Sequence, residues 1–212
     1  MPSMSPEDRE HLDRTARILV RAGYEPLEYI EEALLDLAGE ASESLSDRDI
    51  RVEVRSALVR AVSDLTREQA SWPVLTDFDR LQAAFDTLED EDIVARENFT
   101  CCGTCGASEI VDEIEDFAVE TGRRARGYVF FHQQDTERAV EGEPLYFNYG
   151  TADPDWSEAK SLAIGARLFD VLKSVGLHPQ WDGLLDTRIT VSLDWKRRWE
   201  GPIPKPIKRW FF

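Results

Sequence analysis

The sequence predicts an α+β protein in which an N-terminal helical segment packs on a C-terminal layer of order β-α-β-β-α-β, a split βαβ arrangement. Two patterns lead to this prediction. Apolar residues recur at helical spacing through the first 90 positions, and beyond residue 92 they alternate or run together as they do in strands. The expected organisation is a helical segment over 1–91, an α+β domain over 92–198 and a basic, aromatic tail over 199–212, either docked as layers or integrated into one domain.

Four helices are predicted in the N-terminal segment. Each has an apolar stripe, and three residue signals mark their ends: Gly39 as a C-terminal stop, Trp72-Pro73 as a break and Thr76 as a cap. The expected positions are near Pro6 to Ala22, Leu27 to Leu37, Ser46 to Leu65 and Phe78 to Leu88.

The C-terminal part is predicted to alternate strands with helices. Arg188 to Trp195 is the clearest strand, because Ile189, Val191 and Leu193 alternate with polar residues. The other expected strands are 93–99, 127–132 and 145–149, and the expected helices are 107–121, stopped by Gly122, and a helix opened by 155–158 that runs through Val175 to Gly176. This order of elements is that of a ferredoxin-like layer.

The charge of the chain is strongly negative, with a formal net charge of −17. Residues 1–100 hold 24 acidic and 11 basic side chains, whereas residues 101–212 hold 18 and 14. An acidic body repels nucleic acid and anionic membranes, so we expect neither as a partner and predict a basic protein partner instead. The tail from Trp195 to Phe212 carries six basic residues against Glu200 alone, and we expect it to fold back onto the acidic surface.

Cytoplasmic location is the expectation for this chain. No apolar run approaches the roughly 20 residues that span a bilayer, and the first residues lack the basic and apolar regions of a secretory signal. Three cysteines are an odd number, and the cytosol keeps thiols reduced. A structural disulfide framework is therefore not expected.

All three cysteines lie in one run, Cys101-Cys102-Gly103-Thr104-Cys105-Gly106. Cys102 and Cys105 form a C-x-x-C before an expected helix, whose terminal N–H groups and dipole would stabilise a thiolate for redox or nucleophilic chemistry. The spacing also suits zinc, with Cys101 as a third ligand and His132 or His178 as a fourth. No other cofactor is predicted, and the alternative is that the cysteines are small packed residues in a glycine-shaped turn.

His132 ends an expected strand, where it could act as a base for Cys102 or Cys105, ligate the same metal, or serve only as a hydrogen-bonded strand end. Two strands joined through a helix run parallel, which would bring the cysteine run and His132 to one edge of the sheet. The predicted pocket comprises 101–106, the end of 127–132 and the loop before Leu145. Asp135 is the expected cap of a short helix over 136–140.

Four motifs together resemble a family of uncharacterised bacterial proteins that is catalogued only as a domain of unknown function. They are Asn98 to Gly106, Gly127 to Glu137, Leu145 to Gly150 and Trp181-Asp182-Gly183, and the similarity covers about residues 10–200. The family has no established activity, so the resemblance supports the position of a site and not its chemistry.

The functional prediction has one leading form and two alternatives. The leading form is a binding or interaction protein with an acidic surface, protective toward a basic partner. The alternatives are a thiol-dependent redox protein or enzyme that uses Cys102 and Cys105, and a structural zinc-binding protein. The sequence does not decide whether the protein is an enzyme or what its oligomeric state is.

Overall fold

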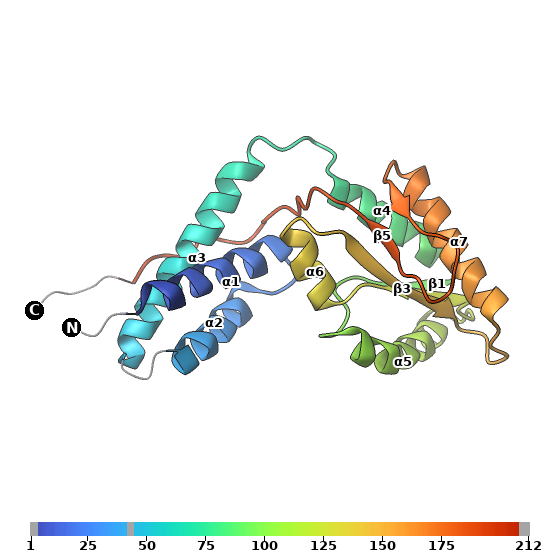
Figure 1. Cartoon of the computed structure of the whole chain (residues 1–212), viewed down its shortest axis with the longest axis horizontal. Coiled ribbons are helices and arrows are strands. Elements are labelled where there is room, and N and C mark those ends of the chain that lie inside the picture. Colours follow the sequence, from blue (N-terminus) through green and yellow to red (C-terminus); the bar gives the residue numbers. More distant parts are fainter. Residues whose placement is uncertain (1–3, 42–44, 208–212) are drawn as a thin grey trace, which may run out of the picture. The chain divides into compact units, whose positions relative to one another are not determined.

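The computed structural model describes residues 4–41 and 45–207, and it confirms the α+β class (Figure 1). Over these residues the chain forms seven helices and a five-stranded mixed sheet. They fall into two compact units. One unit contains residues up to 74 together with 196–207, and the other contains 75–195.

The first unit contains three helices, α1 (Pro6–Ala22), α2 (Leu27–Ala41) and α3 (Asp47–Gln69). Ser5 and Ser46 cap α1 and α3 with side-chain oxygens that accept backbone N–H groups. The predicted stop of α2 at Gly39 is wrong, because the helix continues to Ala41. Gly39 does not adopt a positive φ, and the space beside it is open, so nothing there forces the helix to end.

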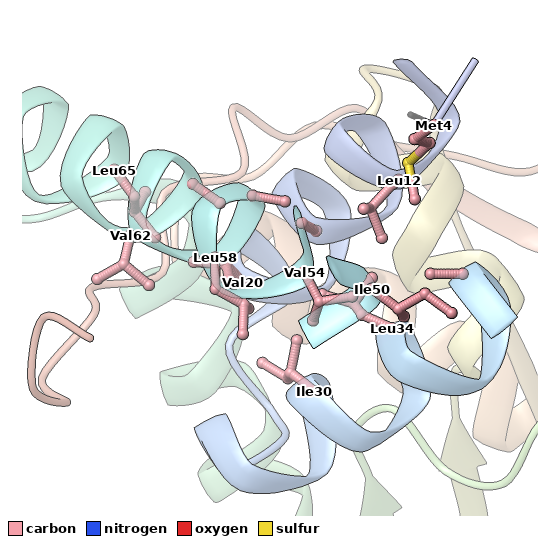
Figure 2. Close-up of a cluster of buried hydrophobic side chains, with 14 residues drawn as sticks. Met4, Leu12, Val20, Ile30, Leu34, Ile50, Val54, Leu58, Val62 and Leu65 are labelled. Carbon is pink, nitrogen blue, oxygen red and sulfur yellow. The ribbon is translucent and has the colours of Figure 1, made fainter. Parts of the chain in front are cut away.

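The core of the first unit lies between these three helices, and Figure 2 shows its apolar side chains meeting from all of them. Leu34, Val54 and Leu58 have no exposed surface. The other buried members are Met4, Leu12, Ala16, Val20, Ile30, Ala38, Ile50, Ala57, Ala61, Val62 and Leu65. Burying such side chains supplies the main stabilisation of a helix bundle, because short helices are marginal in water on their own.

The segment 196–207 runs along this helical unit without regular structure. The Arg197 guanidinium lies 3.9 Å from the centre of the Tyr24 ring, a cation–π contact. The Trp199 N–H donates to Gln69 at 2.9 Å, and the Gln69 amide donates back to the Trp199 carbonyl at 3.1 Å. Part of the predicted basic tail thus packs on its own chain, while Lys208 and Arg209 lie outside the described residues.

The second unit carries the sheet. Its helices are α4 (Asp77–Asp90), α5 (Gly103–Thr121), α6 (Gln133–Val140) and α7 (Glu158–Ser174), and its strands are β1 (Ile93–Arg96), β2 (Gly127–Phe130), β3 (Leu145–Thr151), β4 (Pro179–Gln180) and β5 (Ile189–Val191). Thr76 caps α4 in a capping box with Asp79, as the sequence predicts for the cap. The sequence analysis placed α4 in the helical segment, but in the structure this helix packs on β1.

The strand order is β1-β2-β3-β5-β4, which corrects the predicted split βαβ arrangement. A split unit leaves space for another strand between the two parallel strands, yet β1 and β2 pair directly, with Val94 opposite Tyr128. The remaining pairs are antiparallel. The difference arises because α5 returns the chain directly beside β1, and the sheet gains a short edge strand, β4, that the sequence does not predict.

The two faces of the sheet differ in their cover. Helices α4 and α7 pack on one face, and α5 lies across the other face against β1 and β2 (Figure 1). Partners in register share a face, so Asn148, opposite Phe130, belongs to the α5 side. Tyr146 and its partner Thr190 lie on that side too, because side chains two positions apart point the same way. Beyond α5 this face carries polar residues.

Candidate functional site

The cysteine run follows β1 through a short, tightly held turn. Asn98 and Thr100 adopt positive φ values of 50° and 55°, which β-carbon-bearing residues rarely do. The turn is tied to the end of β2, because the Phe99 N–H donates to Phe131 at 2.8 Å and the Gln133 N–H donates to Thr100 at 3.1 Å. The ends of the parallel strands β1 and β2 therefore meet at one edge, as expected from their order.

Helix α5 begins at Gly103, four residues before the predicted start at Ala107. Cys102 is the residue that precedes the helix, and Cys105 lies in its first turn. Gly106 permits this close approach, because a β-carbon there would lie 2.5 Å from the Phe130 ring of β2. The run predicted as a loop is thus mostly helix, and its thiols lie where unpaired backbone N–H groups gather.

The three thiols form a compact cluster. Their sulfur atoms all lie within 4.8 Å of one another, and the Cys101 and Cys105 sulfurs are 3.5 Å apart. Cys101 is exposed, and Cys102 and Cys105 are partly exposed, so solutes can reach the cluster. Three close thiols can hold a metal ion. Within the described chain, neither His132 nor His178 joins this group of ligand atoms.

The thiols differ in acidity. The backbone N–H groups of Cys105 and Thr104, followed by the neighbouring thiols, lower the pKa of Cys102 below its ordinary value. Hydrogen bonds with Cys101 and Cys102, together with their negative charge when ionised, raise the pKa of Cys105 to about 11. At neutral pH a larger fraction of Cys102 than of Cys105 is therefore ionised to the thiolate.

His132 caps helix α6, which is the role the sequence analysis assigned to Asp135. Its Nδ1 accepts the Asp135 N–H at 3.2 Å, and the Asp135 carboxylate accepts the His132 backbone N–H at 3.4 Å, so the two residues form a capping box. The His132 Nε2 lies 3.0 Å from Asp135 Oδ2. Burial lowers the pKa of His132, which Asp135 partly opposes. Helix α6 starts at Gln133, directly after the capping His132, and β2 ends before the cap at Phe130.

Asp135 holds a second partner, Arg188, at the start of β5. The Arg188 Nη2 donates to Asp135 Oδ2 and, at 3.0 Å, to the Tyr146 carbonyl. Its guanidinium also lies 5.1 Å from the centre of the Tyr146 ring. Asp135 is fully buried, and Arg188 compensates its Oδ2 for lost water, while Asp135 Oδ1 is buried without a hydrogen-bond partner among the described residues. Sequence reasoning missed Arg188 as a site residue; a lone arginine before a strand gives no signal.

The Trp181-Asp182-Gly183 motif forms a turn close to Arg188. The Trp181 indole N–H donates to the carbonyls of Leu184 and Thr187, and Asp182 accepts the Leu184 N–H and the Thr187 hydroxyl at 3.0 Å each. Trp181 thereby fixes the loop that leads into Arg188. His178, a predicted fourth zinc ligand, is exposed on the segment between α7 and β4.

Two adjoining cavities lie on the polar part of the sheet face and share Thr187 and Arg188. The smaller, of about 140 Å³, is lined by Ala107, Tyr128, Phe130, Phe147, Asn148, Tyr149, Leu185, Thr187 and Arg188. The larger, of about 650 Å³, is lined by Arg138, Tyr146, Gln180, Trp181, Asp182, Asp186, Thr187, Arg188 and Thr190. Strand β3 and the 185–188 segment line them, and the predicted loop before Leu145 does not.

The smaller cavity is close to the thiols. A β-carbon on Gly103 would lie 3.5 Å from His132 Nε2 and 4.0 Å from the side-chain oxygen of Asn148, which lines the cavity. Ala107, two residues after Cys105 on α5, lines the cavity as well. The structure thus brings the cysteine run, the end of β2 and β3 together.

No helix among the described residues is long and apolar enough to cross a membrane. Comparison of the sequence with curated proteins and with solved structures gives no match. The family model described as "Domain of unknown function (DUF6891)" matches residues 5–199, which include every element that forms the candidate site. The chain therefore belongs to this family.

Proposed function

We propose that the protein carries out thiol–disulfide exchange at the cysteine cluster. The observation that carries this proposal is the geometry of three accessible sulfur atoms within 4.8 Å of one another at the start of α5. The divided acidity supports it, since the pKa of Cys102 is lowered and that of Cys105 is raised to about 11. Cys102 is thereby the nucleophile at neutral pH, and Cys105 stays protonated until the mixed disulfide has formed.

The exchange has two steps. The Cys102 thiolate attacks one sulfur of a substrate disulfide, forms a mixed disulfide and releases the other substrate sulfur as a thiolate. Cys105 then loses its proton to solvent or to the released thiolate and attacks the Cys102 sulfur. The protein disulfide closes, the second substrate thiolate leaves, and two electrons have passed from the protein thiols to the substrate.

A redox titration tests this proposal. The protein is equilibrated in mixtures of reduced and oxidised glutathione, and the disulfide is located by mass spectrometry. We expect a reversible disulfide between Cys105 and Cys102, with a midpoint between about −120 and −270 mV, the range of thiol oxidoreductases. Cys102→Ser should remove the Cys102–Cys105 disulfide, whereas Cys105→Ser should trap the mixed disulfide on Cys102. Three thiols that stay reduced across the series would contradict the proposal.

Metal binding is a second candidate function, which the same sulfur cluster favours. Cys101, Cys102 and Cys105 would supply three thiolates, and water or another ligand would complete a tetrahedral zinc site of the open kind. Equilibrium dialysis against zinc should then give one ion per chain and protect the cysteines from alkylation. Cys101→Ser separates the two functions, because it removes a metal ligand and leaves the Cys102–Cys105 exchange pair intact.

The predicted basic protein partner would fit the acidic surface near this site. Helix α5, which begins at the thiols, carries six acidic side chains and no basic one: Glu109, Asp112, Glu113, Glu115, Asp116 and Glu120. A basic protein partner would be attracted to this helix. Its capture should weaken as salt rises from about 0.05 to 0.5 M, because exposed charges are screened over a Debye length. Capture that does not depend on salt would argue against an electrostatic partner.

A further inference from the structure

The smaller cavity beside the thiols has one charged group among the described residues that line it, Arg188. The rest of its lining is aromatic, aliphatic or neutral polar, with Tyr128 and Phe130 on β2 and Asn148 on β3. A mostly apolar pocket with a single cation and an amide is suited to a small molecule that has an apolar body and one anionic end. A carboxylate can accept charge-assisted hydrogen bonds from a guanidinium and a further hydrogen bond from an amide.

Two donors at this cavity lack partners. Within the described residues the Arg188 Nε and the Asn148 Nδ2 are buried and make no hydrogen bond. Buried polar atoms without partners cost free energy, and native proteins keep few of them unless a water or a ligand completes the site. Both residues line the smaller cavity, so the oxygen atoms of a ligand there would accept hydrogen bonds from both donors after small side-chain adjustments.

Arg188 is held in place before any ligand arrives. Its Nη2 is fixed by Asp135 and by the Tyr146 carbonyl, and its guanidinium lies 5.1 Å from the Tyr146 ring centre. Asp135 is itself fixed by the His132 capping box. The Arg188 side chain keeps 33% of its surface exposed, and it lines both cavities. A preorganised donor binds without the entropy loss of ordering a flexible arginine.

We propose that the cavity lined by Arg188 and Asn148 binds a small organic carboxylate. That this carboxylate belongs to the substrate disulfide rests on the proposed function. The closeness of Gly103 to His132 and Asn148 supports this assignment, because a β-carbon on Gly103 would lie 4.0 Å from the Asn148 oxygen at the cavity. The net charge of −17 repels anions in general, so a preference for carboxylates must come from local groups.

Binding is tested without relying on redox chemistry. Suberate has the shape of dithiodipropionate with the disulfide replaced by two methylenes, and its binding to the protein is measured by calorimetry at physiological salt. We expect binding to the wild type and to the variant with Cys101, Cys102 and Cys105 all changed to serine. Arg188→Gln should weaken it about tenfold or more, because a charge-assisted hydrogen bond is lost.

Arg188→Gln leaves Asp135 without its arginine partner, and the variant could misfold for that reason. A second variant therefore tests the cavity independently. Ala107 is exposed on α5 and lines the cavity, so Ala107→Trp should fill it without disturbing the core. Ser108→Trp, on the next exposed position, is the matched control and should bind suberate normally. Absence of binding to the wild type, or binding unaffected by both Arg188→Gln and Ala107→Trp, would overturn the proposal.

The substrate assignment has its own readout. The rates at which dithiodipropionate and its neutral diamide oxidise the thiols are measured, and their ratio is taken. This ratio should be about tenfold higher in the wild type than in Arg188→Gln. A ratio that Arg188→Gln does not change would remove the carboxylate from the substrate. If the thiols react with neither disulfide while suberate still binds, the proposed function fails and the carboxylate site stands.

Discussion

Replacing Cys101 and Cys102 by serine should make Cys105 more reactive, although two reactive groups are removed. Their hydrogen bonds and charge hold the pKa of Cys105 at about 11, against an ordinary value of 9.0. Loss of both thiols lowers the pKa by about two units, which raises the thiolate fraction at neutral pH about a hundredfold. Intrinsic nucleophilicity falls with pKa with a Brønsted coefficient of about 0.4–0.5, so the net gain in rate is about tenfold.

The assay is the rate of alkylation of Cys105 by iodoacetamide at pH 7, followed by mass spectrometry of the peptide that contains it. The double variant has no other cysteine, and in the wild type the same peptide is resolved by site. Cys101→Ser alone should give the larger part of the gain, because its hydrogen bond is the largest contribution. A rate in the double variant equal to or below that of the wild type would refute the coupling between these thiols.

Three further predictions concern stability, measured as free energies of unfolding in denaturant. Leu58→Ala should cost about 2–5 kcal/mol, because Leu58 is fully buried among the helices of the first unit; a smaller loss would mean a loose core. Gly39→Ala should stabilise by about 0.5–1 kcal/mol, since its surroundings are open, whereas Gly127→Ala should destabilise, since a β-carbon would lie 2.6 Å from a β3 carbonyl; equal effects would contradict this contrast. Arg167 lowers the pKa of Glu91, so the stability that Glu91 adds over Glu91→Gln should be present above pH 4.5 and lost as pH falls further; a constant difference would refute it.

The helices could be predicted well because their signals are local. Ser46 and Thr76 were recognised as helix starts, and each caps its helix with a side-chain oxygen. The strand order could not be predicted in the same way. A run such as Gly127 to Phe130 shows that a strand is buried but not which neighbour it pairs with, because pairing depends on how α5 returns the chain beside β1.

The candidate site shows the same division between local and distant information. The cysteine run was evident from residue spacing, and the parallel pairing of β1 with β2 followed from a helix between them. Asp135 and Arg188 lie 53 positions apart, and no periodicity links them. Their pairing depends on β5 reaching β3, so only the folded chain places the arginine beside Tyr146 and Asn148.

The two partners of Asp135 Oδ2 help to explain how a carboxylate can be fully buried in the first turn of α6. One of its oxygens, Oδ2, accepts the His132 N–H that starts α6 and also pairs with Arg188 of the segment leading into β5. A buried charge without partners costs several kcal/mol, whereas one that is paired and hydrogen-bonded can be retained. The helix start and the arginine therefore depend on each other. A ligand bound through Arg188 would contact a cation whose position depends on Asp135, the partner of His132 in the capping box of α6.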